Sequence, residues 1–492
     1  MFATRLALLF TLLIATTGGA PRESLPHLLD RMRESGGPAW SAHLASTSLL
    51  TMDGASTRVT SDSQGVRFAT YECAKSLCDG EYFDGERLYS ININRTTLPQ
   101  SDLGDAFLRA ERTIASHAFL SPEFADDGGA IADDGFTTIE GTSYRTILVS
   151  NSGSVPMQVF IDPSTARIRY LRDITGESTI EYRDYRHVGS SLVLPFLVMR
   201  NGSVLERYED RSVRPDPFTQ PRGFAPAFAG PPTPVATDPN RTIPVFSCTI
   251  DGIATTCLLD TGNSGLAISE ELVARLHPPV VGQIQISGLG KYVAQIVRTG
   301  PLSAGNATFP EANYVVLRDI HRFGYDVVLG ADVLASTRIE LDPSAHRIMF
   351  DVTAAPPGET VSLHFLNFVP IISVQLGSVG AQLALDTGDE SNINLSYDFY
   401  NEHRDLFAAT EQRIVSGVGG SSIEFIGNIP EVKIGSISVR DQRIGTTTTL
   451  RSTAYGHLGA GFLGQFTVLL DYARSRVEFI HTSAGGPGPS RK

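Results

Sequence analysis

The sequence is poor in cysteine, in basic runs and in long apolar stretches. Its 492 residues include 4 cysteines and carry a formal net charge of −13, without a cluster of lysine and arginine. Nucleic-acid-binding proteins present a basic surface to the phosphates, so this charge argues against nucleic acid as a partner. After the first 20 residues no stretch approaches the run of about 20 apolar residues that a membrane span needs. Because no His/Cys spacing indicates a metal site, we expect neither a metal nor another cofactor.

The N-terminus has the pattern of a secretory signal peptide. Arg5 precedes an apolar run at residues 6–15, and small residues follow at 16–20. The run is too short to cross a bilayer comfortably, and its flanks fit a signal peptide better than a buried N-terminal helix. We therefore expect residues 1–20 to be removed and the protein to be exported, to the periplasm or the extracellular space.

The four cysteines fall into two close pairs, Cys73 with Cys78 and Cys248 with Cys257. The second pair would face each other across a hairpin if Gly252 and Ile253 were its two central residues. An oxidising compartment favours two local disulfides, whereas four free buried thiols are the alternative.

The second half of the chain contains a repeat whose two copies each include Asp-Thr-Gly. Residues 243–262 align without a gap with residues 369–388, so that Asp260 matches Asp386 at an offset of 126 positions. Further on, the offset becomes 129 and pairs Leu329-Gly330-Ala331 with Leu458-Gly459-Ala460. One net insertion of three residues reconciles both offsets. A period this long indicates a duplicated domain and not a solenoid unit.

Each copy has the pattern of a small β domain. A hairpin with Asp251-Gly252 near its tip leads into an apolar strand that ends at Asp260. Residues 287–290 (Ser-Gly-Leu-Gly) predict the tip of a second hairpin, and residues 327–329 predict a short buried strand that Gly330 ends.

This unit resembles one lobe of the retropepsin and pepsin families of aspartic proteases. The resemblance covers about the second half of the chain. It implies a mainly β fold with two pseudo-symmetric lobes, residues 241–355 and 360–482, on one chain and hence a monomer. It also implies an aspartic endopeptidase acting on peptides or proteins, with Asp260 and Asp386 as the catalytic carboxylates.

The resemblance assigns supporting roles to the residues around each aspartate. Hydroxyls of the threonines would interlock the two loops, the glycines of Asp-Thr-Gly would keep the loops tight, and hairpin flaps would close over the substrate. The implied residues are Thr261, Gly262, Thr387 and Gly388 in the loops, and Gly288, Gly290, Gly417 and Gly419 in the flaps.

Two carboxylates within hydrogen-bonding reach can share one proton, because both cannot ionise at that distance. The ionised one can take a proton from water while the other protonates the carbonyl oxygen. Asp389, three residues after Asp386, would hold the shared proton to higher pH if its charge lay near the pair.

Four features depart from the family pattern. They are His457 in place of an apolar residue, Tyr292 after the flap glycines, and the pairs Asn263-Ser264 and Asp389-Glu390 after the two Asp-Thr-Gly motifs. The two lobes should therefore present unequal walls to a substrate.

The first half of the chain predicts a separate α+β domain, residues 21–214. A helical pattern from Leu25 precedes a series of alternating strands with a second helical patch at residues 103–118. This order resembles the half-barrel of periplasmic lipoprotein-carrier proteins. Residues 215–240 are rich in proline and predict a stiff linker, and residues 483–492 predict a disordered tail.

Two other functions fit the same sequence. Both lobes could keep the scaffold and only bind peptides, or the N-terminal domain could carry lipid or lipoprotein in the periplasm. The presence of both Asp-Thr-Gly motifs favours the protease.

Overall fold

A computed structural model describes residues 23–52, 54–74, 77–100, 105–287, 291–354, 356–417, 420–447 and 456–481. The predicted signal peptide and C-terminal tail lie outside these residues, as do Gly288, Gly290 and Gly419. The described residues are 55% strand and 15% helix, which confirms the predicted mainly β class. No helix in the described ranges is long and apolar enough to cross a membrane.

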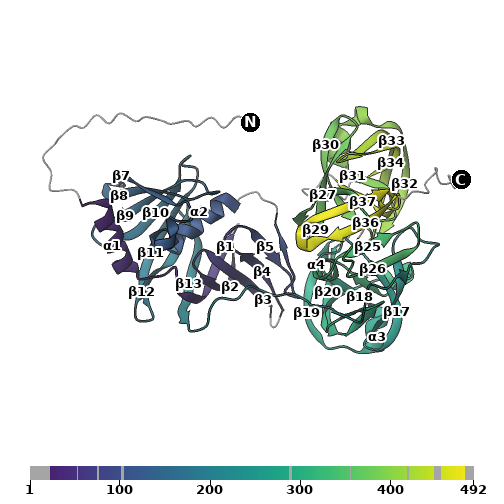
Figure 1. The fold of residues 1–492 in the computed structure, drawn as a ribbon, viewed down its shortest axis with the longest axis horizontal. Coiled ribbons are helices and arrows are strands. Elements are labelled where there is room, and N and C mark those ends of the chain that lie inside the picture. The colour runs from purple at the N-terminus through teal and green to yellow at the C-terminus, as the bar shows by residue number, and fades with distance from the viewer. Residues whose placement is uncertain are drawn as a thin grey trace.

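The N-terminal domain is one large antiparallel sheet with two helices on one face (Figure 1). Its 13 strands follow the order β6-β5-β4-β3-β2-β1-β13-β12-β11-β10-β9-β8-β7, so the chain forms two meanders that join where β1 pairs with β13. The elements are α1 (Leu25–Gly36), β1 (His43–Met52), β2 (Ala55–Gln64), β3 (Arg67–Ala74), β4 (Leu77–Phe83), β5 (Leu88–Ile91), β6 (Thr97–Pro99), α2 (Asp105–Ala115), η1 (Ala118–Leu120), η2 (Pro122–Phe124), β7 (Ala130–Ile139), β8 (Thr142–Ser150), β9 (Met157–Asp162), β10 (Arg167–Asp173), β11 (Thr179–Val188), β12 (Leu192–Arg200) and β13 (Ser203–Arg214).

Each helix packs against the sheet and buries one apolar face. Leu28 and Met32, one turn apart on α1, are fully buried, as are Ala110 and Ile114 on α2. They share a core cluster with sheet residues such as Val159. Burying one such large side chain contributes about 1.5–3 kcal/mol, so helix and sheet depend on each other.

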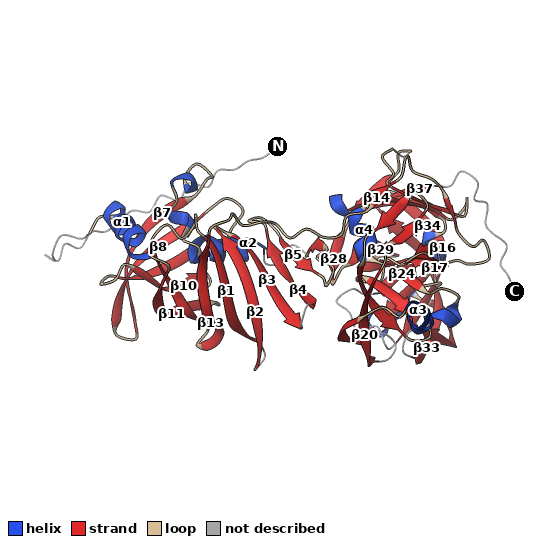
Figure 2. Ribbon diagram, turned by 90° about the horizontal axis from the view of Figure 1, so that it is seen from below, coloured by secondary structure: helices blue, strands red, loops and turns tan. Residues whose placement is uncertain are grey.

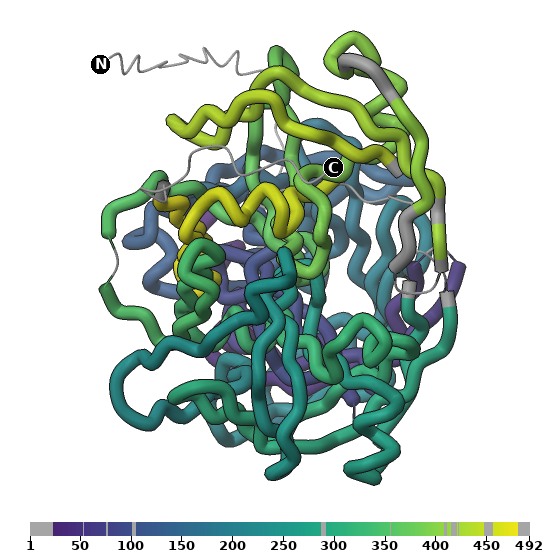
Figure 3. The backbone as a smooth tube through the Cα atoms, turned by 90° about the vertical axis from the view of Figure 1, so that its right-hand side faces the viewer, coloured from purple at the N-terminus to yellow at the C-terminus, as the bar shows by residue number. Residues whose placement is uncertain are grey.

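The two copies of the repeat form two sheets with the same strand order. In the first lobe the order is β17-β24-β18-β23-β20-β19, and in the second it is β30-β35-β31-β34-β33-β32, with matching parallel and antiparallel pairs. Figure 3 shows the first lobe below and the second above. The strands of these sheets are β14 (Ala227–Phe228), β16 (Val245–Ile250), β17 (Ile253–Leu259), β18 (Leu266–Ser269), β19 (Val280–Ser287), β20 (Lys291–Thr299), β21 (Leu302–Ala304), β22 (Ala307–Phe309), β23 (Ala312–Leu317), β24 (Val327–Leu329), β28 (His364–Leu366), β29 (Val369–Leu376), β30 (Val379–Asp386), β31 (Ile393–Ser396), β32 (Ala408–Gly417), β33 (Gly420–Ile434), β34 (Ile437–Thr447) and β35 (Gly456–Gly459).

A third, 6-stranded sheet joins the lobes and shows their symmetry. Its central pair is β25 with β36, where Glu340 lies opposite Leu469, the residue that matches it at an offset of 129. A strand that pairs with its own counterpart at equivalent residues places a pseudo-two-fold axis at that point. The sheet consists of β15 (Val235–Ala236), β25 (Ile339–Asp342), β26 (Arg347–Phe350), β27 (Glu359–Ser362), β36 (Phe466–Asp471) and β37 (Arg476–His481). Short helices complete the lobes: α3 (Glu270–Leu276), η3 (Ile320–Phe323), α4 (Ala331–Ser336), α5 (Tyr397–Glu402), η4 (Arg404–Leu406), α6 (Ala460–Leu463) and η5 (Tyr472–Arg474).

The proline-rich segment after β13 packs along its length. Phe218 is buried against Tyr82 of the N-terminal domain, whereas Phe224 stacks on Phe309 of the first lobe. Strands β14 and β15 then add to the edges of two sheets. The segment therefore joins the two parts as a bound strap, and its phenylalanines are the anchors.

Both predicted disulfides are present, Cys73–Cys78 and Cys248–Cys257. The predicted register of the second hairpin is wrong, because Ile250 pairs with Ile253 and the central residues are Asp251 and Gly252. Both have positive φ, 49° and 75°, as the tight turn of a two-residue hairpin requires. Cys248 therefore lies opposite Thr255, and the disulfide runs diagonally to Cys257 on the same face, over a Cα–Cα distance of 5.9 Å.

The N-terminal domain meets the rest of the chain at its β5 end (Figure 2), and the turn between β5 and β6 contacts the first lobe there. Asp332, on α4, is fully buried, and its carboxylate accepts Asn92 Nδ2 at 2.8 Å, Asn94 Nδ2 at 2.8 Å and the Thr96 hydroxyl. Burial raises the pKa of Asp332, while these three hydrogen bonds lower it. The matching position in the second lobe is Gly461, so only the first lobe offers this carboxylate.

We expect Asp332→Asn to lower the free energy of unfolding by about 1–3 kcal/mol, measured by urea denaturation. All three partners donate, so an amide in this place turns its own N–H₂ group toward at least one of the asparagine donors. Asp319→Asn, at an exposed pair with Arg322, is the matched control and should change little. If Asp332→Asn were as stable as the wild type, these hydrogen bonds would not contribute to the free energy of unfolding as we expect.

Candidate active site

The first Asp-Thr-Gly loop is fixed by the strand behind it. Asp260 follows the buried end of β17, and its N–H donates to Leu329 O on β24 at 2.9 Å. Immediately after β24, the N–H of Gly330 donates to Gly265 O at 2.9 Å and that of Ala331 to Asn263 O at 3.0 Å. The loop is therefore bound at both ends to one short segment.

The second loop repeats this arrangement. Asp386 ends β30 and pairs with Gly459 of β35. The N–H of Gly459 donates to Asn392 O at 2.8 Å, and that of Ala460 to Asp389 O at 2.7 Å. Equivalent backbone bonds therefore hold both aspartates at the same place in each lobe.

The two carboxyl groups meet across the lobe interface. Each accepts the N–H of the glycine in its own loop, Gly262 to Asp260 Oδ1 at 2.8 Å and Gly388 to Asp386 Oδ1 at 3.0 Å. A Cβ added to Gly262 would lie 2.7 Å from the Asp386 carboxyl carbon, and one added to Gly388 would lie 2.6 Å from that of Asp260. These glycines are therefore required by the close approach of the opposite carboxylate.

The threonines of the two motifs lock the loops together. Thr261 N–H donates to Thr387 Oγ1 at 3.0 Å, and Thr387 N–H donates to Thr261 Oγ1 at 3.0 Å. Each hydroxyl donates to the other lobe, Thr261 to Leu385 O at 2.6 Å and Thr387 to Leu259 O at 2.7 Å. Both threonines are 1% exposed, so the four bonds are shielded from water.

Burial and the neighbouring carboxyl disfavour ionisation of Asp260. Burial, followed by the nearby charge of Asp386, raises the pKa of Asp260 well above its ordinary value, and a hydrogen bond between the two carboxyls adds to the effect. The N–H of Gly262 acts in the opposite direction but is outweighed. Asp260 therefore holds a proton at pH values where an ordinary aspartate is ionised.

His457 lies between two carboxylates next to this pair. Its Nδ1 is 3.2 Å from Asp386 Oδ2, and its Nε2 is 3.0 Å from Asp389 Oδ2. Burial alone lowers the pKa of His457, but the close carboxylates of Asp386 and Asp389 raise it to about 10. Burial likewise opposes ionisation of Asp389, but His457 and Ser391 lower the pKa of Asp389 to about 2. His457 and Asp389, whose side chains are 18% and 22% exposed, thus form a partly buried ion pair at neutral pH.

The sequence identified His457 only as a departure from an apolar pattern. Its counterpart in the first lobe is the buried Val328, at an offset of 129, so the cation is present on one side only. A usable signal was the combination of a histidine on a buried strand with an extra aspartate just after Asp386. Asp389 was expected to hold the shared proton to higher pH if its charge lay near the pair, and the structure pairs that charge with His457.

We expect the ion pair to give the protein a defined pH window of stability. The pKa of His457 rises from 6.5 to about 10 on folding, so its contribution is complete below pH 6.5 and is lost as pH approaches 10. The pKa of Asp389 falls from 3.8 to about 2, so its contribution is complete above pH 3.8 and is lost below it. The difference in unfolding free energy between the wild type and His457→Gln should therefore be largest between these two limits. If this difference in unfolding free energy did not change with pH, His457 would not be charged in the folded protein.

The predicted flaps are antiparallel hairpins, β19 with β20 and β32 with β33. Gly417 ends β32 and pairs with Gly420, while the other three predicted flap glycines lie outside the described residues. The guanidinium carbon of Arg318 lies over the ring of Tyr292, 5.0 Å from the ring centre. The second hairpin exposes the paired Ile414 and Ile423, at 78% and 54%. This exposed apolar pair could contact the apolar side chains of a bound peptide.

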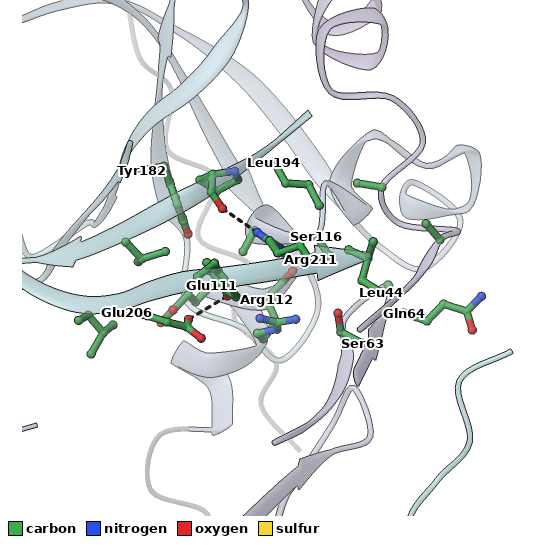
Figure 4. Close-up of a pocket in the computed structure, with 18 residues that line it drawn as sticks. Leu44, Ser63, Gln64, Glu111, Arg112, Ser116, Tyr182, Leu194, Glu206 and Arg211 are labelled. Carbon is green, nitrogen blue, oxygen red and sulfur yellow. Dashed lines mark hydrogen bonds between the residues drawn. The ribbon is translucent and has the colours of Figure 1, made fainter. Parts of the chain in front are cut away.

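The N-terminal domain contains a small polar cavity between α2 and the sheet (Figure 4). Its volume is about 70 Å³, below the roughly 300 Å³ at which pockets for small organic ligands begin. Glu111 and Arg112 from α2 and Glu206 and Arg211 from β13 line it. Glu111 pairs with Arg200 at 3.0 Å. This charged, narrow space does not favour an acyl chain.

Comparison with known proteins bears on the first lobe. A search of curated proteins found no match to the chain. A family model described as aspartyl protease matches residues 246–333, which include the first loop and β24 but end before the second lobe. The match supports an aspartic protease family for this part of the chain.

Proposed function

We propose that this chain is an aspartic endopeptidase of the two-lobed, retropepsin-like kind, with Asp260 and Asp386 as its catalytic pair. One observation carries the proposal: each carboxyl lies against the glycine of the other loop, in a frame of four reciprocal threonine bonds. Two carboxylates that must share a proton give no advantage to a scaffold that only binds peptides. A hydrolase needs such a pair, because one carboxylate activates water while the other donates a proton.

The reaction follows from the shared proton. The ionised carboxylate takes a proton from a water molecule as the water oxygen attacks the peptide carbonyl carbon. The neutral carboxyl gives its proton to the carbonyl oxygen, so a neutral tetrahedral diol forms. Proton transfer to the nitrogen then lets the C–N bond break, and the pair recovers one proton.

The substrate would be an extended chain held between the lobes. Hairpins β19–β20 and β32–β33 offer backbone edges and the exposed Ile414 and Ile423, which suit an extended peptide with apolar side chains. Closure over the substrate would exclude water from the pair. Both loops belong to one chain, so a monomer suffices.

We also propose that the protein is exported. Its two disulfides, Cys73–Cys78 and Cys248–Cys257, suit an oxidising compartment. The N-terminal signal pattern agrees with this. Mass spectrometry of the non-reduced protein recovered outside the cytoplasm would test both points.

The test of the activity is digestion of a peptide library across pH, with mass spectrometry of the products. We expect internal cleavage that a statine-type inhibitor blocks, because its hydroxyl mimics the tetrahedral diol. Tight peptide binding without cleavage would instead identify a non-catalytic binding protein. Lipid extraction by the full chain without cleavage would favour a carrier function of the N-terminal domain.

A further inference from the structure

The two carboxyls of the pair are not equivalent. Asp386 accepts Gly388 N–H on Oδ1 at 3.0 Å and has His457 Nδ1 at 3.2 Å from Oδ2. Among the described residues, the Asp260 carboxyl accepts the matching glycine N–H on Oδ1, and Val328 stands where the second lobe has His457. A carboxylate with an additional charged donor keeps its negative charge more readily.

The charges around His457 leave it as a local cation. On its own sheet it pairs with Asn394, a neutral side chain whose Nδ2 donates to Glu424 Oε1 at 3.1 Å. Glu424 is itself paired with Arg413 at 2.5 Å, so this side is balanced.

Two tyrosines lie near the pair. Burial raises the pKa of Tyr472 well above its ordinary value and that of Tyr325 to about 12, so both are neutral near pH 7. Arg241 and Glu390 act on Tyr325 with opposite charges. The groups that decide the charge of His457 are therefore Asp386 and Asp389.

We infer that His457, held as a cation between Asp386 and Asp389, keeps Asp386 as the ionised member of the pair and leaves the shared proton on Asp260. The inference rests on the proposed function and makes it more specific. His457 acts through Asp386 and is a positioning residue. Asp389 completes the arrangement by neutralising the cation on its far side.

The roles in the reaction then follow. Asp386 takes the proton from water as the C–O bond forms, and Asp260 gives its proton to the carbonyl oxygen. In the second half, protonated Asp386 gives its proton to the nitrogen, and Asp260 takes one back from a diol hydroxyl as the C–N bond breaks. The products are an amine and a carboxylic acid, and the proton is again on Asp260.

Nitrogen NMR of histidine-labelled protein tests where the proton lies, independently of activity. The chain has 11 histidines, and the signal missing in His457→Gln identifies the one of interest. We expect a charged ring at pH 8 in the wild type and an unchanged ring pKa in Asp260→Asn, because asparagine imitates the neutral carboxyl there. In Asp386→Asn the ring pKa should fall by about one unit or more. The reverse pattern, with His457 sensitive to Asp260→Asn only, or a neutral ring in the wild type, would overturn the inference.

The pH profile of kcat supplies the second readout. Its alkaline limb reports loss of the shared proton. Asp389→Asn exposes the pair to an unbalanced cation and should move the limb down by about one pH unit, whereas His457→Gln leaves an unbalanced anion and should move it up. The double variant should lie between them, and His187→Gln, on the exposed face of β11, should match the wild type.

The two tests separate the two claims. Shifts in the same direction for both single variants, or no shift in either, would overturn the role of His457 while leaving the peptidase intact. A wild type without peptidase activity would overturn the proposed function, and the NMR experiment would still decide the placement of the proton.

Discussion

Asp260→Asn and Asp386→Asn should each lower kcat by at least about a thousandfold, because each removes one half of a unit that shares a proton. Asparagine keeps the shape of the side chain but can neither accept a proton from water nor return one to the diol. The double variant should be scarcely slower than either single variant, since the second substitution acts on a pair that no longer works. Rates on a cleavable peptide at the optimal pH of the wild type measure all three.

The fold should survive these substitutions. Replacing Asp260 removes a carboxyl whose burial and whose neighbour Asp386 disfavour ionisation, so the unfolding temperature should stay the same or rise. Asp251→Asn, at the exposed tip of the β16–β17 hairpin, is the matched control and should leave kcat unchanged. Near wild-type activity in either Asp260→Asn or Asp386→Asn would end the assignment of the pair.

Thr387→Val should cost about 2–6 kcal/mol of unfolding free energy and most of the activity. Valine has the shape of threonine but leaves Leu259 O without a donor that now lies at 2.7 Å, and Thr261 N–H without an acceptor at 3.0 Å. Each buried polar group that loses its partner costs about 1–3 kcal/mol. The loops that hold the two carboxyls would also lose half of their mutual bonds. Urea denaturation and kcat measure the two effects.

Thr387→Ser is the matched control, because it keeps the hydroxyl and deletes a methyl group worth about 1 kcal/mol. It should retain most of the activity. Thr261→Val should behave like Thr387→Val, because each substitution removes a different two of the four bonds between the loops, and the double variant should lose all four. If serine were as damaging as valine, packing and not the hydrogen bonds would hold the loops.

The repeat could be recognised in the sequence because it depends on local order. An apolar strand that runs into Asp-Thr-Gly, twice, with the same following strand at a fixed offset, fixes which two loops correspond. The mainly β class and the two cysteine pairs follow from similar short-range patterns. The hairpin register around Cys248 did not follow, because Asp251-Gly252 and Gly252-Ile253 both read as turns until the strand pairing is known.

Only the tertiary structure shows which side chains from distant parts of the sequence come into contact. His457 reaches Asp386 because β35 pairs in parallel with β30, and Asp389 turns back to the same ring from the following loop. Asn92 and Thr96 reach Asp332 through the packing of one domain on another. The sequence by itself predicted Asp260 and Asp386 as a pair, since motif and spacing carry them. It could not predict the inequality that we infer between them, because the charge on a carboxyl depends on which groups surround it in space.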